Sequence, residues 1–107
     1  MERWIGVDFD GTLVTHEFPR IGKDIPLMIS RVEKWRAAGI KVKILTARTS
    51  GFTHDVRKWL DARGWQDIEI TASKDYCMIE LWDDRAVSVE LNTGKQLSPS
   101  SLEDGDA

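Results

Sequence analysis

Residues 3–13 read RWIGVDFDGTL, and the fold of the chain is best worked out from this stretch. Its first half, residues 3–8, is a short apolar run that ends abruptly in an acid, which is typical of a buried strand. A second acid, Asp10, and a glycine that suits a tight turn, Gly11, follow at once. The pattern therefore predicts a buried strand with polar chemistry at the point where the strand ends.

Two later segments combine a helical spacing of apolar residues with a glycine where the helix should stop. The first covers residues 25–38, with Asp24 placed to cap its start and Gly39 placed to end it. The second begins near residue 53 and ends at Gly64. We therefore expect two helices, each with an apolar side that faces inward.

Further segments have the apolar runs or the alternation of strands, at residues 40–46, 67–71, 78–82 and 86–91. Strands that alternate with helices favour a parallel sheet that is covered on both faces. We expect an α/β fold, with a single three-layer, Rossmann-like domain and a mainly parallel central sheet over residues 1–95. Residues 96–107 are rich in Ser, Pro, Gly and acid, which predicts a disordered tail.

The composition limits the classes of partner. The chain has 107 residues, a formal net charge of −3 and a pI near 5.3, so its net charge does not favour a nucleic-acid partner, although a local basic rim would be compatible with one. No apolar run approaches membrane-spanning length, and Cys77, the only cysteine, permits no internal disulfide. We therefore expect a cytoplasmic protein without a membrane partner.

Polar side chains gather at or just past the predicted strand ends, namely Asp8, Asp10, Thr46, Lys74, Asp83 and Asp84. In a parallel sheet, ligands bind beyond the carboxyl ends of the strands, so these side chains should share one crevice. Four carboxylates that converge repel one another, and a single lysine cannot neutralise them. Because Mg²⁺ prefers oxygen ligands, a magnesium ion beside a substrate phosphate would fit such a crevice.

Each residue type suggests a role in phosphate chemistry. Asp8 is the candidate nucleophile, and Asp10 is placed to act as general acid and then as base. The other candidates would contact the phosphate: the backbone N–H groups around Gly11, the Thr46 hydroxyl, the Lys74 ammonium and the Arg48 guanidinium. For Arg48 a surface salt bridge is an equally good interpretation. Arg85 either orients the neighbouring acids or faces solvent, and His16 is interpreted as a loop residue.

Four motifs in order, IGVDFDGTL, KILTAR, TASKD and ELWDDRA, resemble those of the haloacid dehalogenase superfamily of phosphatases. The resemblance spans residues 3–91 and implies an aspartyl-phosphate intermediate on Asp8. It also implies a Mg²⁺ ion held by Asp8, the backbone carbonyl of Asp10, and Asp83, with Asp84 in support. The lysine is the least specific of the four matches.

Members of this superfamily often carry a cap domain, after the first motif or between the second and third. Residues 11–24 leave room only for a flap, and residues 48–73 are used by a helix and a strand, so the chain resembles the small capless type. The resemblance then implies an open site for a large phosphorylated substrate, or for a small one if a homo-oligomer supplies a lid. The class of substrate stays open.

Two other classes of protein share parts of this pattern. Receiver-like phosphoacceptor modules use an acid cluster, a threonine and a lysine on a small sheet, but their acid pair comes first and the phosphorylated aspartate follows a later strand. A non-catalytic binding protein could keep the same fold, although such proteins usually lose an acid and every expected acid is present here. Rapid turnover of a phosphate ester with Mg²⁺ would separate the phosphatase from both.

Overall fold

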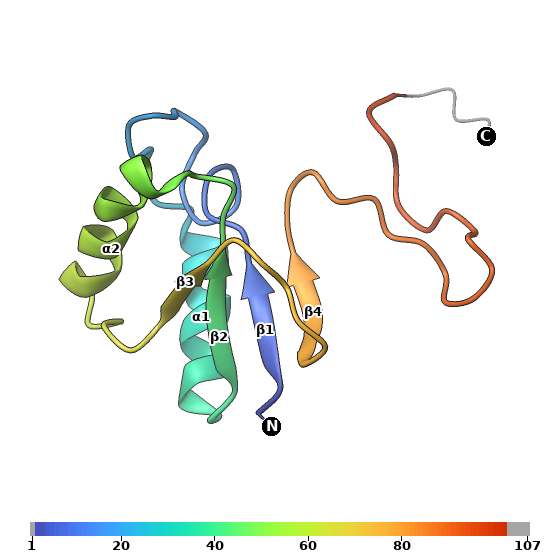
Figure 1. Ribbon diagram of the computed structural model, residues 1–107, viewed down its shortest axis with the longest axis horizontal. Coiled ribbons are helices and arrows are strands. Elements are labelled where there is room, and N and C mark those ends of the chain that lie inside the picture. Colours follow the sequence, from blue (N-terminus) through green and yellow to red (C-terminus); the bar gives the residue numbers. More distant parts are fainter. Residues whose placement is uncertain (1, 103–107) are drawn as a thin grey trace.

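Strand β1 (Trp4–Val7) lies inside a four-stranded sheet, as its apolar sequence predicts. The structure, a computed structural model that describes residues 2–102, orders the strands β3-β2-β1-β4 and pairs all of them in parallel (Figure 1). The other strands are β2 (Lys41–Leu45), β3 (Glu69–Thr71) and β4 (Met78–Trp82). All four residues of β1 are buried, and the strand has a neighbour on each side.

Two helices connect the strands. Helix α1 (Pro26–Ala37) follows β1, and α2 (Thr53–Ala62) follows β2 after a 3₁₀ turn, η1 (Ser50–Phe52). Both helices end as predicted, at glycines with φ of +81°, a left-handed conformation that favours glycine. No helix within the described residues is long and apolar enough to cross a membrane.

The predicted cap at the start of α1 is wrong. The N-cap residue is Ile25, which has no side-chain capping bond, and Pro26 occupies the first turn, where its missing N–H is not needed. The carboxylate of Asp24 instead accepts hydrogen bonds from Trp59 Nε1 at 3.0 Å and from Arg63 Nη2 at 2.8 Å. Asp24 therefore ties the start of α1 to helix α2.

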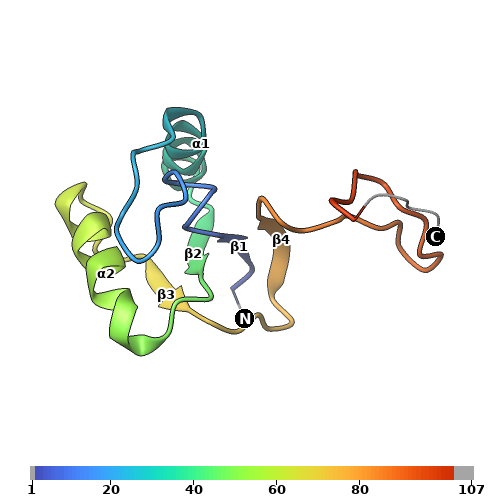
Figure 2. The same ribbon diagram turned by 90° about the horizontal axis from the view of Figure 1, so that it is seen from above.

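Both helices pack on the same face of the sheet (Figure 2). Their buried residues form one core with the inward residues of β1 and β2, and the members are Met28, Val32, Val56, Leu60, Ile5, Val7, Val42 and Ile44. The steps from β1 to β2 and from β2 to β3 run in the same direction, and right-handed crossovers then place both helices on one side. The parallel, Rossmann-like α/β domain is thus confirmed.

The third layer that the alternating pattern predicted is absent from residues 2–102. The return from β3 to β4 is the loop 72–77, which contains no helix. Part of the missing cover comes from Trp4, which is 1% exposed, donates a hydrogen bond to Asp75 at 2.9 Å and lies 4.5 Å from the Lys43 ammonium. The face opposite the helices is therefore partly covered by a loop and long side chains, and Leu81 on this face stays exposed.

Residues 86–102 leave the sheet beyond β4 and extend away from it in both views (Figures 1 and 2). The strand predicted at residues 86–91 does not form, because this segment pairs with no strand of the sheet and makes a single isolated bridge, Val89 to Gln96. The turn predicted at residues 92–94 is present and carries the chain into a small hairpin. Alternating apolar residues specify which side of a strand is apolar, but they do not provide a partner.

The hairpin includes residues on both sides of the domain boundary expected at residue 95. Leu97 N–H donates to the carbonyl of Ser88, and Glu90 N–H donates to the carbonyl of Lys95, both at 2.8 Å. Residues 103–107 of the predicted tail lie outside the described part of the chain.

Deleting residues 96–107 is expected to change the free energy of unfolding by less than about 1 kcal/mol, the range of ordinary surface changes. Within the described part of the chain, the hydrogen bonds that residues 96–98 make to other residues reach only Ser88, in the other arm of the hairpin. Urea denaturation of the shortened and full-length chains measures the difference. A larger loss would show that this segment packs on the domain or on a second copy.

Candidate functional site

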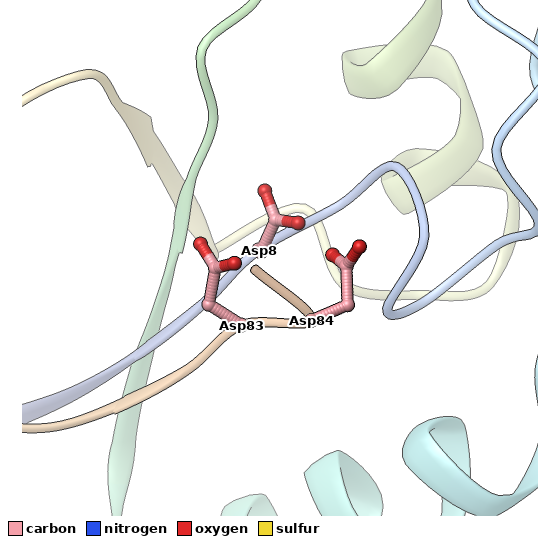
Figure 3. A group of neighbouring side chains, drawn as sticks. All are labelled: Asp8, Asp83 and Asp84. Atoms are coloured by element: carbon pink, nitrogen blue, oxygen red, sulfur yellow. The ribbon is translucent and has the colours of Figure 1, made fainter. Parts of the chain in front are cut away.

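Three carboxylates converge at the carboxyl edge of the sheet (Figure 3). Asp8 follows β1, and Asp83 and Asp84 follow the neighbouring strand β4. The Asp8 N–H donates to the Trp82 carbonyl at 2.9 Å, so the pairing of the two strands continues up to the acids. Each acid offers an oxygen within 4.8 Å of the other two, and the side chains point to the same side in the figure. The structure thus brings together three of the predicted site residues.

The turn after β1 holds Asp84 against Asp8. Gly11 has φ of +90°, and a Cβ atom there would lie 2.7 Å from an Asp84 carboxylate oxygen, so only glycine fits. The Thr12 hydroxyl lies 3.0 Å from Asp84 Oδ1 and 3.4 Å from Asp8 Oδ2, and it accepts the Asp84 N–H at 3.2 Å. Sequence reasoning missed Thr12, although its place in DFDGTL was a usable signal.

The backbone N–H of Gly11, which was expected near the phosphate, already has a hydrogen-bond partner within the protein. It donates to the Val14 carbonyl at 2.7 Å, inside the turn, so this N–H is not directed at a phosphate. The main contribution of Gly11 to the site is therefore the close approach of Asp84.

Crowding of the acids changes the proton affinity of Asp8. Burial, a hydrogen bond with Asp84 and the negative charges of Asp83 and Asp84 raise the pKa of Asp8 to about 7. Burial also acts against ionisation of Asp84, but hydrogen bonds from Asp8 and Thr12 outweigh it and lower the pKa of Asp84. The opposite directions of the two shifts place the proton between these carboxyl groups on Asp8 and leave Asp84 ionised.

Metal-free protein is expected to lose stability as the pH rises from 5 to 8. The folded pKa of Asp8 is raised above its unfolded value of 3.8, so the folded state binds more protons in this interval and its advantage disappears as Asp8 ionises. We expect Asp8→Asn to stabilise the metal-free protein at pH 8 by about 1–2 kcal/mol, a figure reduced for partial solvent screening.

Urea denaturation in EDTA at several pH values measures this effect. The exposed acid Glu33, on α1 away from the site, supplies a matched control in Glu33→Gln, which should keep the wild-type pH dependence. Parallel pH profiles for wild type and Asp8→Asn would contradict the raised pKa.

Asp10 does not join the three acids in the cluster but forms an ion pair with Arg48. The carboxylate oxygens lie 2.7 and 2.8 Å from Nη2 and Nε of the guanidinium, and the Arg48 side chain is 1% exposed. The hydrogen bonds with Asp10 raise the pKa of Arg48 above its ordinary value. The surface salt bridge considered for Arg48 is thus a buried pair 38 residues apart in sequence.

A pocket of about 330 Å³ opens beside the acids. Its lining includes the predicted residues Asp8, Asp10, Thr46, Arg48 and Asp83, together with Ala47, His16, Phe18 and Arg85. The Thr46 hydroxyl accepts a hydrogen bond from the backbone N–H of Arg48 at 3.1 Å. The hydroxyl proton of Thr46 can still be donated to a substrate oxygen. Arg85 and His16 thus bring basic side chains to the pocket.

The structure does not bring Lys74 to this pocket. Lys74 is exposed in the loop 72–77 and is not among the lining residues. Arg85 lies directly after the acid pair, and its own N–H donates to Asp83 at 2.7 Å. His16 had no sequence signal, because a single histidine in a loop has no spacing to interpret.

Comparisons with known proteins support the fold and leave the activity open. No family model and no curated protein matches the sequence. The chain is similar to a solved structure described as that of a conserved protein from Bacteroides thetaiotaomicron, with 26% sequence identity and a TM-score of 0.67. The similarity covers 81% of this chain and 79% of the other, so it extends over most of the α/β domain described above.

Proposed function

We propose that this protein is a Mg²⁺-dependent phosphatase that hydrolyses phosphate monoesters through an aspartyl-phosphate on Asp8. The observation that carries the proposal is the convergence of Asp8, Asp83 and Asp84 at the carboxyl edge of the sheet. Their order in the sequence agrees with the motifs that resemble the haloacid dehalogenase superfamily. A phosphatase of this kind needs a nucleophilic carboxylate next to a metal site, and the three carboxylates at this edge of the sheet are candidates for both roles.

The donor set fits Mg²⁺. All three side chains offer oxygen atoms, and their spacing suits a single small cation with additional water ligands. Burial raises the pKa of Asp8, and the negative charges of Asp83 and Asp84 raise it further. A bound Mg²⁺ would balance these negative charges and would reduce the repulsion between the nucleophile and the substrate phosphate. Asp8 and Asp83 would hold the ion, with Asp84 beside them.

Asp8, Asp10 and Thr46 then have separate roles in the two steps of the reaction. An Asp8 oxygen attacks phosphorus, and the bond to the ester oxygen breaks as Asp10 gives that oxygen its proton. In the second step, Asp10 takes a proton from a water molecule, whose oxygen attacks phosphorus. The bond between phosphorus and Asp8 then breaks, which releases phosphate and returns Asp8 to its carboxylate form. Thr46 donates a hydrogen bond to a phosphoryl oxygen throughout.

Basic groups near the pocket are available to bind the phosphate. Arg85 and His16 line the pocket, and we propose Arg85 in the charge-balancing role for which Lys74 was the sequence candidate. The connections at this edge, residues 8–25 and 46–52, contain no additional domain that would enclose a substrate. The site therefore suits the phosphorylated part of a substrate whose remainder extends into solvent.

Turnover of p-nitrophenyl phosphate tests the proposal. Phosphate release should require Mg²⁺ and stop when EDTA removes the ion. A long-lived phosphoenzyme without steady turnover would favour a receiver-like module instead. No phosphate release and no phosphoenzyme, with Mg²⁺ bound, would indicate a non-catalytic binding protein.

A further inference from the structure

We infer that Arg48 is a positioning residue that holds Asp10 in place as the base for the second chemical step, and that it does not bind substrate. The inference rests on the proposed phosphatase function and assigns Arg48 a role within it. The hydrogen bonds of the guanidinium group leave no free N–H donor for a phosphate.

All the donors of Arg48 are used inside the protein. A guanidinium group has five N–H donors and no acceptor. Two of them hold both oxygens of Asp10, and the other three reach the backbone carbonyls of Pro19, Arg20 and Phe52, at 3.1–3.2 Å. Because the Arg48 side chain is only 1% exposed, a substrate phosphate could gain a hydrogen bond from it only by displacing one of these partners.

The surroundings of Arg48 fix it rigidly. The guanidinium carbon lies 5.7 Å from the Phe9 ring centre and 5.0 Å from that of Phe18, so aromatic faces flank the group. The carbonyls that hold it belong to the flap after β1 and to the turn before α2, two segments that also meet through the Phe18 and Phe52 rings, whose centres are 5.1 Å apart. Arg48 therefore joins three parts of the site through one planar group.

This geometry favours one of the two roles of Asp10. Both carboxylate oxygens accept hydrogen bonds from Arg48, which is the arrangement of a proton acceptor. Asp10 must act as acceptor when water attacks the aspartyl-phosphate. Loss of the clamp should therefore slow breakdown of the phosphoenzyme more than its formation, particularly for a substrate whose leaving group needs little help from an acid.

Rapid-mixing kinetics with p-nitrophenyl phosphate separates the two steps. The burst of p-nitrophenol reports formation of the phosphoenzyme, and the later steady rate reports its breakdown. Arg48→Lys keeps the charge but cannot hold both oxygens in the same plane. We expect it to slow breakdown by about 10–100-fold and formation by less than about threefold. kcat and KM should then fall together.

Two further variants test the route through Asp10. Asp10→Asn should show the same kinetic signature, and the combined Arg48→Lys/Asp10→Asn variant should be hardly slower than Asp10→Asn alone. Arg57→Met is the matched control, because Arg57 also binds an aspartate and two backbone carbonyls but lies away from the pocket. It should leave both steps unchanged.

Each outcome bears on a different claim. If Arg48→Lys slows formation and breakdown equally, or adds fully to Asp10→Asn, Arg48 is only a structural link between the flap and α2, and the inference is wrong. An increase in KM at unchanged kcat would show that Arg48 binds substrate. If the wild type with bound Mg²⁺ neither releases phosphate nor forms a phosphoenzyme, the proposed function fails and the inference fails with it. Thermal melting of each variant shows that it is folded.

Discussion

Replacing Asp8 with asparagine is expected to lower kcat for p-nitrophenyl phosphate by at least about 10⁴-fold, because the amide cannot form the bond to phosphorus. The substitution preserves the size of the side chain. It also removes the cost of ionising a buried carboxyl group beside Asp83 and Asp84, which raises the pKa of Asp8, so the metal-free variant should be more stable than the wild type at pH 8.

The gain in stability makes the kinetic result easy to interpret. An inactive variant that melts at a higher temperature has lost its chemistry and not its fold. Glu33→Gln, which changes an exposed acid on α1, should keep full activity. A folded Asp8→Asn protein that retained a tenth of the wild-type kcat would show that Asp8 is not the nucleophile.

Replacing Asp83 with alanine should weaken Mg²⁺ binding by about 10–100-fold or more, because one of the three converging carboxylates is lost. Titration calorimetry measures the affinity, and the Mg²⁺ concentration that gives half-maximal turnover checks it independently. At saturating Mg²⁺, part of the activity should return.

Glu33→Ala provides the matched control for loss of one negative charge elsewhere on the domain. It should leave the Mg²⁺ affinity within about twofold of wild type, since exposed charges act weakly over distance in salt. Equal Mg²⁺ affinities for wild type and Asp83→Ala would show that the metal does not bind at this cluster. Another positive group would then have to balance the negative charges of Asp8 and the substrate phosphate.

Local patterns in the sequence were sufficient to predict most of the sheet. The apolar run before Asp8 and the alternation in β2 identify strands, and strand ends in a parallel sheet identify the crevice. The convergence of Asp8 with Asp83 and Asp84 follows from that rule without any knowledge of contacts. Both helix ends were also readable, because a glycine with positive φ is a local requirement.

Features that depend on distant partners could not be predicted in this way. The alternating residues 86–91 resemble a strand, but the sequence does not say whether an edge is available to pair with them. Asp24 has the chemistry of a helix cap, yet Trp59 and Arg63 bind its carboxylate. Arg48 and Asp10 are 38 residues apart in the sequence, so no short spacing motif predicts their ion pair.

The place of β4 in the sheet gives the acid cluster a link to local unfolding. Strand β4 pairs with β1 alone among the described strands, whereas β1 and β2 each have two neighbours. An edge strand of this kind can detach and exchange its amide hydrogens while the rest of the core stays intact. Detachment would carry Asp83 and Asp84 away from Asp8, so a cation shared by them would bind only the attached state. Binding of a cation at this site would therefore stabilise the pairing of β4 with β1 and complete the folding of this strand.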